Sequence, residues 1–340
     1  MAHDKIMYID YIYMDYAKYI VSFGLLLAVA AIYEKYKVHT IEDEEMRQYE
    51  LVRKYLVTDS SLAKSKLPIL WIYVDYSVNA RDWPSFFSRN TMDLNQPYML
   101  LTIKSIIDKC GGNFNICIID DESFQNIIPG WNIDMSRIAE PIHDKVRDLA
   151  MARLLKYYGG LVVPPSFICE QDLAKVFYGV TGTYSKPLIG ELIDRNVTSS
   201  GRDFMVSRKF LGAQKDCPVI NDYISYLERL ISNDYTAESV FEGSQDRWLQ
   251  DAVSNGRITK IDASLLGQED MDGKPVVIDR LLGSSFIDLN PNRLGVYIPS
   301  ESLLKRTNYQ WFAYLSAKEA IASDTFVGKV LLCKSASCGC

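Results

Sequence analysis

Histidine is scarce in this chain of 340 residues, which contains only His3, His39 and His143. A zinc site built from histidines therefore has too few ligands. Basic residues are also in the minority, because 37 Lys and Arg face 43 Asp and Glu and the net charge is −6. Nucleic-acid-binding proteins carry clustered Lys and Arg, and no such stripe occurs here. We therefore expect no nucleic-acid partner.

Several well-known site motifs are missing as well. The sequence has no G-x-G-x-x-G and no G-x-S-x-G nucleophile elbow. The loop GQEDMDGKP at 267–275 narrowly fails as a phosphate loop, because five residues separate its glycines and a proline follows its lysine. Its Asp-Met-Asp at 270–272 is interpreted as a solvated turn. None of these three kinds of site is predicted.

The cysteines do not form a disulfide framework of the secreted type. Their number is odd and they are scattered along a long chain, which favours a reducing compartment. The last three lie in a tail that we place at 326–340, where they could bind metal, cross-link to a partner or accept lipid. The seven are Cys110, Cys117, Cys169, Cys217, Cys333, Cys338 and Cys340.

One long apolar run is present, IVSFGLLLAVAAIY at 20–33. It is shorter than the roughly 20 residues that a bilayer requires, but tyrosines extend it to 13–36 and suit membrane interfaces. We predict a membrane-anchor helix at 13–36. A buried or partner-packed helix is the alternative, and a signal peptide is a third interpretation, although the preceding segment is acidic.

The other predicted parts of the chain lie before and after the predicted anchor helix at 13–36. A short tail precedes it, and a charged helix with a polar linker follows it. A large domain then occupies 67–325 before the cysteine-containing tail. The predicted boundaries are 1–12, 13–36, 37–66, 67–325 and 326–340.

Strand and helix patterns alternate through the large domain. Apolar runs predict strands, and apolar residues at helical spacing ended by Gly-Gly predict helices. This alternation predicts an α/β fold with a mostly parallel sheet flanked by helices, whose ligands bind beyond the carboxyl ends of the strands. Asp120 and Asp121 end one of those strands. The predicted strands are 68–76, 114–121, 161–163, 186–190 and 202–210, and the helices are 97–110, 141–158, 218–231 and 244–253.

The segment RDLAMARLLKYYGGLVVPPSF at 147–167 is the most informative. Asp148 stands twelve residues before Gly160, and KYYGG leads into the apolar strand LVV. This pattern resembles the central motif of the capsular-polysaccharide-synthesis-like and family 32-type glycosyltransferases, which occur also in large DNA viruses. The stretches 70–76, 95–121 and 203–230 are similar to other parts of that family. The resemblance implies a GT-A-like nucleotide-diphospho-sugar transferase fold.

The chain departs from this family where the metal would bind. The two aspartates of the family's Asp-x-Asp fall on Pro164 and Ser166, and its arginine falls on Met151. In the family these aspartates hold a divalent cation that neutralises the diphosphate, and carboxylate oxygens are the ligands that such cations prefer. Proline offers no side-chain ligand. We therefore expect no cofactor and a fold that has lost its catalysis.

An active, metal-independent transferase is the alternative. It would take a nucleotide-sugar, with Asp148 or Asp121 as base. Arginines would replace the cation. Mn²⁺ or Mg²⁺ is expected only under this alternative. The candidate substrate-binding residues are Asp120, Asp121, Asp148, Arg81, Arg89 and Arg153.

A domain that lacks the metal-binding residues needed for catalysis still has the shape and the surface of its fold. We therefore expect a scaffold attached to a membrane through 13–36, whose partners are the membrane and neighbouring structural proteins. The viral relatives imply a minor capsid or virion membrane-associated component, located between the internal membrane and the capsid. A sugar-binding module without turnover is a third interpretation.

Overall fold

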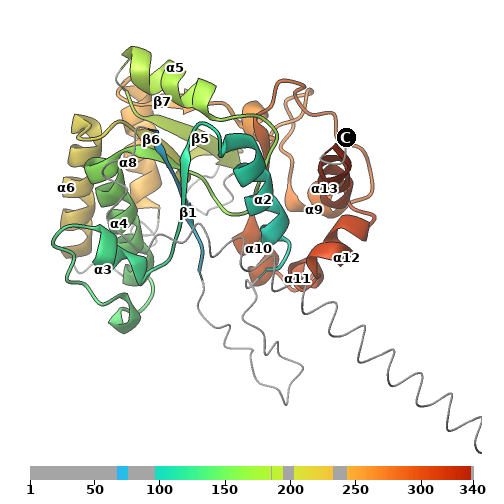
Figure 1. The fold of residues 1–340 in the computed structure, drawn as a ribbon, viewed down its shortest axis with the longest axis horizontal. Helices are drawn as coiled ribbons and strands as arrows, with labels where there is room; N and C mark the ends of the chain where they lie inside the picture. The colour runs from blue at the N-terminus through green and yellow to red at the C-terminus, as the bar shows by residue number, and fades with distance from the viewer. Residues whose placement is uncertain (1–66, 76–95, 185, 194–202, 233–242, 338–340) are drawn as a thin grey trace, which may run out of the picture. The chain divides into compact units, whose positions relative to one another are not determined.

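The computed structural model describes residues 67–75, 96–184, 186–193, 203–232 and 243–337 (Figure 1). The predicted segments 1–12, 13–36 and 37–66 lie outside the described residues, as do Arg81 and Arg89. Among the helices that are described, none has the length and apolarity needed to cross a bilayer.

A six-stranded sheet forms the centre of the described domain, in the order β2-β1-β3-β6-β5-β7. Five strands run in one direction, and β6 alone runs against its neighbours β3 and β5. The predicted α/β class with a mostly parallel sheet is confirmed, and it is consistent with a GT-A-like fold. The strands are β1 (Ile69–Tyr73), β2 (Asn115–Ile119), β3 (Gly160–Val162), β5 (Leu188–Ile193), β6 (Phe204–Ala213) and β7 (Thr259–Ile261).

Helices cover both faces of the sheet. In Figure 1 the helices α3, α4, α6 and α8 lie on one side of it, and α2 lies on the other. Strands buried on both faces read as continuous apolar runs, which is why ILWIY and NICII carry no alternation. The helices are α2 (Met99–Cys110), α3 (Ser123–Ile127), α4 (Ile142–Tyr158), α5 (Ala174–Tyr184), α6 (Pro218–Ser232) and α8 (Ser244–Ser254).

The Gly-Gly of the informative segment makes the turn from α4 into β3. Gly159 has φ +68° and Gly160 has φ +107°, values that side chains rarely allow. A Cβ on Gly160 would lie 2.1 Å from the carbonyl oxygen of Ile69 in the neighbouring strand. The indole Nε1 of Trp71 donates to the carbonyl of Gly159 at 2.9 Å. The close approach of β3 to β1 therefore requires Gly160, whereas a Cβ on Gly159 would lie 2.7 Å from the backbone nitrogen of Lys215, just after β6.

A second, two-stranded antiparallel sheet pairs β4 (Phe167–Cys169) with β8 (Gly295–Tyr297). Short or terminal helices also form after residue 277, and the sequence patterns predicted none of them. They are α9 (Ile278–Leu282), α10 (Ser300–Lys305), α11 (Gln310–Ala313), α12 (Ala317–Ala322) and α13 (Phe326–Ser337). The described residues also form 3₁₀ turns at η3 (Met135–Arg137) and η5 (Ala263–Leu266).

The last described helix lies within the segment assigned to a tail at 326–340. Residues 326–337 of that segment form α13. The reason is hydrophobic burial, because Phe326, Val327 and Leu331 are buried where α13 packs against α9 and α12. Cys333 on this helix is exposed.

Candidate functional site

Three of the charged residues singled out from the sequence, Asp120, Asp121 and Asp148, lie at the carboxyl edge of the sheet. Parallel β1, β2 and β3 end at this edge, and α4 begins there because it leads back toward the start of β3. The first two turns of α4 therefore bring their charged side chains beside the strand ends, where ligands bind in such folds. Two separate ion clusters result, one around Asp121 and one around Asp148.

The Asp121 carboxylate is held by three neighbours. Arg147 donates to both of its oxygens, from Nε to Oδ1 at 3.0 Å and from Nη2 to Oδ2 at 2.9 Å. The Tyr73 hydroxyl donates to Oδ1 at 2.9 Å, and the Nε2 atom of His143 lies 3.2 Å from Oδ2. Arg147 also lies 4.7 Å above the Tyr73 ring and donates to Asp144 at 2.8 Å. Bidentate arginine pairs are strong and directional, so this carboxylate is engaged rather than available as a base.

Burial and charge act together on the groups around Asp121. Burial raises the pKa of the Tyr73 hydroxyl well above its usual range, against the opposing effect of Arg147. Burial alone would lower the pKa of Arg147, but its hydrogen bond to Asp121 raises that pKa. Tyr73 therefore stays neutral and Arg147 stays charged at any physiological pH.

Asp120 has a different role from its neighbour. Its Oδ1 accepts hydrogen bonds from the backbone N–H and the hydroxyl of Ser123, at 2.8 Å for the N–H. Such bonds from a short acidic side chain to the backbone a few residues later make a turn. Asp120 thus shapes the entry into α3, and the structure does not join it to the Asp148 cluster.

The Asp148 carboxylate lies in a cluster built from α4, β6 and α8. The Arg208 guanidinium bridges two acids, from Nε to Asp148 Oδ2 at 2.7 Å and from Nη1 to Asp246 Oδ1 at 3.1 Å. The Gln245 side chain donates to Asp148 and accepts from Lys145. Two carboxylates thus face two cations. The cluster balances its own charge.

This cluster is largely shielded from solvent, although the side chains of Arg208, Asp148 and Asp246 are 24%, 16% and 16% exposed. Lys145 is 4% exposed and Gln245 is fully buried. Burial raises the pKa of Asp148 above its usual value, although Arg208 opposes that shift. The pKa of Arg208 is raised, because the pull of Asp148 and Asp246 outweighs the effect of burial. This ion network joins α4, β6 and α8, and within it the Asp148 carboxylate has hydrogen-bond and ion-pair partners.

Two other predicted positions lie away from both clusters. Arg153 pairs with Glu228 of α6 at 2.7 Å and lies 5.6 Å from the Trp131 ring. It therefore ties α4 to its neighbours, and the structure does not bring it to Asp121 or Asp148. Met151 packs against the hydrophobic core beneath α4. An apolar contact thus stands where the family's arginine would be.

The segment 164–166, which the sequence resemblance aligns with a metal motif, is packed into the protein. Pro164 and Ser166 are buried, with Ser166 0% exposed. The Thr102 hydroxyl of α2 donates to the carbonyl of Pro165, and the N–H of Ile298 donates to the carbonyl of Ser166 at 3.1 Å. The Ser166 hydroxyl is buried and has no hydrogen-bond partner within the described part of the chain. These contacts pack the segment against α2 and against the residue that follows β8.

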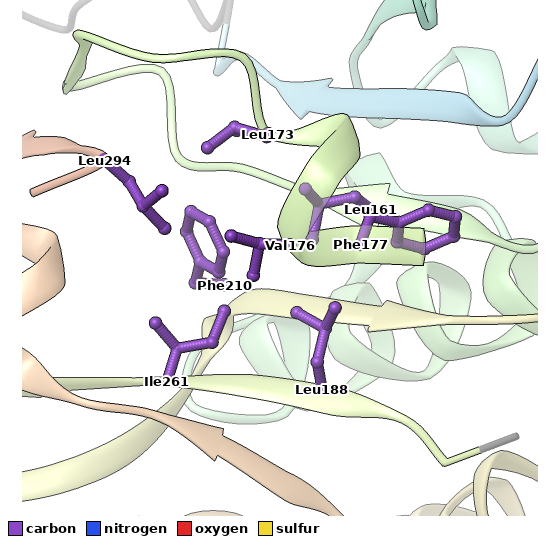
Figure 2. Close-up of a pocket in the computed structure, with 8 residues that line it drawn as sticks. All are labelled: Leu161, Leu173, Val176, Phe177, Leu188, Phe210, Ile261 and Leu294. Carbon is purple, nitrogen blue, oxygen red and sulfur yellow. The ribbon is translucent and has the colours of Figure 1, made fainter. Parts of the chain in front are cut away.

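An apolar gap lies between α5 and the sheet, and it does not serve as a polar ligand site. Figure 2 shows hydrophobic side chains converging on it from several elements. It has no room for a water molecule, and none of the candidate residues lines it. Its lining is Leu161, Leu173, Val176, Phe177, Leu188, Phe210, Ile261 and Leu294.

One group of side chains has the composition of a metal site. Ligand atoms of Glu140, His143 and Asp144 lie within 4.8 Å of one another. The Arg147 guanidinium, however, lies 2.8 Å from the Asp144 carboxylate and 3.2 Å from His143 Nδ1. A cation placed there would meet a fixed positive charge, so the geometry does not favour metal binding.

The literal Asp-x-Asp is a turn, as predicted. Asp270 accepts from the backbone N–H groups of Asp272 at 3.0 Å and Lys274 at 2.8 Å, and it pairs with Arg280 at 2.7 Å. Asp270 is buried rather than solvated, because the loop folds over it. Its carboxylate is engaged within the turn.

Comparison with known proteins gives little further information. No protein-family model and no curated protein matches this chain. A solved structure titled "PaToxG Glycosyltransferase" is similar with a TM-score of 0.30 and 15% sequence identity, over 58% of this chain and 77% of that chain. The fold assignment therefore rests on the strand order and the strand directions.

Proposed function

We propose that this chain is a non-catalytic protein built on a glycosyltransferase-like α/β domain, with a structural role in an assembly. The observation that carries the proposal is the burial of Pro164 and Ser166 directly after β3. The resemblance places a metal-binding Asp-x-Asp there. Proline and a buried serine supply neither carboxylates nor an open site.

The chemistry of sugar transfer supports this proposal. A departing nucleoside diphosphate develops negative charge, which a divalent cation or arginines must stabilise. At this edge Arg147 is engaged by Asp121, and Arg208 is engaged by Asp148 and Asp246. The same contacts pair the carboxylates of the two candidate bases, Asp121 and Asp148, with arginines. A donor would have to displace these ion pairs before it could bind.

The assembly that we propose is membrane-associated. The apolar segment 13–36 would attach the chain to a membrane, and the viral relatives of the resembled family favour a virion location between membrane and capsid. Alkaline carbonate extraction of membranes from expressing cells tests the attachment. The chain should stay in the pellet, and its release into the supernatant would contradict the anchor.

A donor-release assay tests the loss of catalysis. The full chain is incubated with a panel of nucleotide-sugars in Mn²⁺, in Mg²⁺ and in EDTA, and free nucleotide is measured. We expect no release above a protein-free blank in any condition. Donor-specific release that Asp148→Asn abolishes would instead support the metal-independent transferase. Glycan binding without nucleotide release would support the sugar-binding module and would also contradict the scaffold.

A further inference from the structure

Two buried cysteines meet where α2 packs against β4. Cys110 is the last residue of α2 and Cys169 is the last residue of β4. Their Sγ atoms lie 3.8 Å apart, and both side chains are 0% exposed. Cys110 and Cys169 are far apart in the sequence, so only the folded chain brings their thiols into contact. The two sulfurs form a defined pair.

The backbones on both sides of this pair are tied together. The N–H of Cys169 donates to the Ser105 hydroxyl of α2 at 2.8 Å, and the Thr102 hydroxyl donates to the carbonyl of Pro165 just before β4. The Cys169 thiol also donates to the carbonyl of Gln171 at 3.1 Å. A disulfide needs an S–S distance of about 2.05 Å, so the sulfurs must approach by roughly 1.8 Å. Rotation about the Cα–Cβ bonds can supply that approach.

We propose that Cys110 and Cys169 are a redox-active pair that a peroxide converts into an intramolecular disulfide. In the first step the Cys110 thiolate attacks one peroxide oxygen, the O–O bond breaks and water leaves after protonation, which gives a sulfenic acid. In the second step Cys169 loses its proton and attacks the Cys110 sulfur, so that the S–O bond breaks and a second water leaves. Two thiols and one peroxide thus yield one disulfide and two waters.

The surroundings favour Cys110 as the attacking group. The contact between the two thiols lowers the pKa of the Cys110 thiol, whereas the same contact and burial raise the pKa of Cys169. The thiolate is the nucleophile in such reactions. Exposed Gly111 and Gly112 follow Cys110 directly. Fraying of this last helical turn gives a small peroxide access to the buried sulfur.

The cross-link would act on the segment that replaces the metal motif. β4 begins directly after Pro164–Ser166, so a disulfide would fix that segment covalently to α2. It would also close a loop of some sixty residues, and closing long loops restricts the unfolded chain. The oxidised protein is therefore expected to melt several degrees above the reduced one.

The test is peptide mapping of the full chain after treatment with hydrogen peroxide. Free thiols are blocked with N-ethylmaleimide in denaturant before trypsin digestion. Cleavage after Lys109 and Arg137 places Cys110 and Cys117 in one peptide, so the Cys117→Ser variant is used beside the wild type. Burial raises the pKa of Cys117 to about 12, and the Cys117→Ser substitution removes a buried thiol outside the proposed pair, which makes it a matched control.

The expected product is a pair of peptides, 110–137 and 157–175, joined with the loss of two hydrogen atoms and separated by dithiothreitol. Cys169→Ser should abolish the pair and leave a sulfenic acid at Cys110 that dimedone traps. If Cys169→Ser fails to fold, the peptide maps of the wild type and of Cys117→Ser are sufficient to test the proposal. The proposal is overturned if Cys110 and Cys169 both accept N-ethylmaleimide at peroxide doses that oxidise Cys333. Linkage of either residue to a different cysteine also overturns it.

Discussion

Replacing Gly160 with alanine is expected to lower the free energy of unfolding by about 4 kcal/mol or more, a loss at the extreme of single substitutions. The added Cβ would lie 2.1 Å from the carbonyl oxygen of Ile69 and 3.2 Å from Trp71 Nε1. The first of these neighbours is backbone in a paired strand, so it cannot move without breaking the β1–β3 ladder. The φ of +107° adds strain for any side chain.

A second glycine provides the control for this prediction. Gly179 lies in α5, where an added Cβ would have no neighbour within 4 Å and the φ is not unusual. Because alanine favours helix, Gly179→Ala should raise the free energy of unfolding by up to about 1 kcal/mol. Urea denaturation followed by tryptophan fluorescence measures both variants. Equal stability of Gly160→Ala and the wild type would show that β3 does not approach β1 this closely.

Arg208→Ala is expected to lower the free energy of unfolding by about 3–5 kcal/mol, as found when one partner of a buried ion pair is removed. The substitution leaves Asp148 and Asp246, each 16% exposed, without the guanidinium that bridges them. Two adjacent acids then repel each other in a poorly solvated place. The cost arises from the charges left behind rather than from the lost contact itself.

The matched control is an exposed pair. Lys274 and Asp272 are 69% and 75% exposed, so Lys274→Ala should change stability by less than about 1 kcal/mol. The double variant Asp148→Asn with Arg208→Met should recover part of the loss, because only the Asp246 carboxylate is then left without the guanidinium and the repulsion between the two acids is gone. A loss below about 1 kcal/mol for Arg208→Ala would mean that the cluster is open to water.

The sheet and its long helices could be predicted from the sequence because their signals are local. Continuous apolar runs gave β1 and β2, and Gly-Gly gave the end of α4. The helices after residue 277 could not be predicted in the same way. Most are four to six residues long. Such short helices do not contain enough residues to show the repeating apolar pattern of a long helix. They are stabilised mainly by packing on neighbouring elements.

The candidate site was predicted in part. The sequence pointed to Asp121 and Asp148 and to the edge of the sheet where both lie. It gave no indication of their partners, because Arg147 and Arg208 become neighbours of these acids only in the folded chain. Side-chain pairing between distant elements has no spacing rule comparable to the helical period. The contact between Cys110 and Cys169 was not predictable for the same reason.

We propose that the segment 164–166, which the resemblance aligns with a metal-binding Asp-x-Asp, does not support binding of a nucleoside diphosphate through a metal. Isothermal titration of the full chain with uridine diphosphate and guanosine diphosphate, with and without Mn²⁺, tests it most directly. We predict no measurable heat of binding for either nucleotide in either condition. Saturable, Mn²⁺-dependent binding with a micromolar Kd would contradict the account.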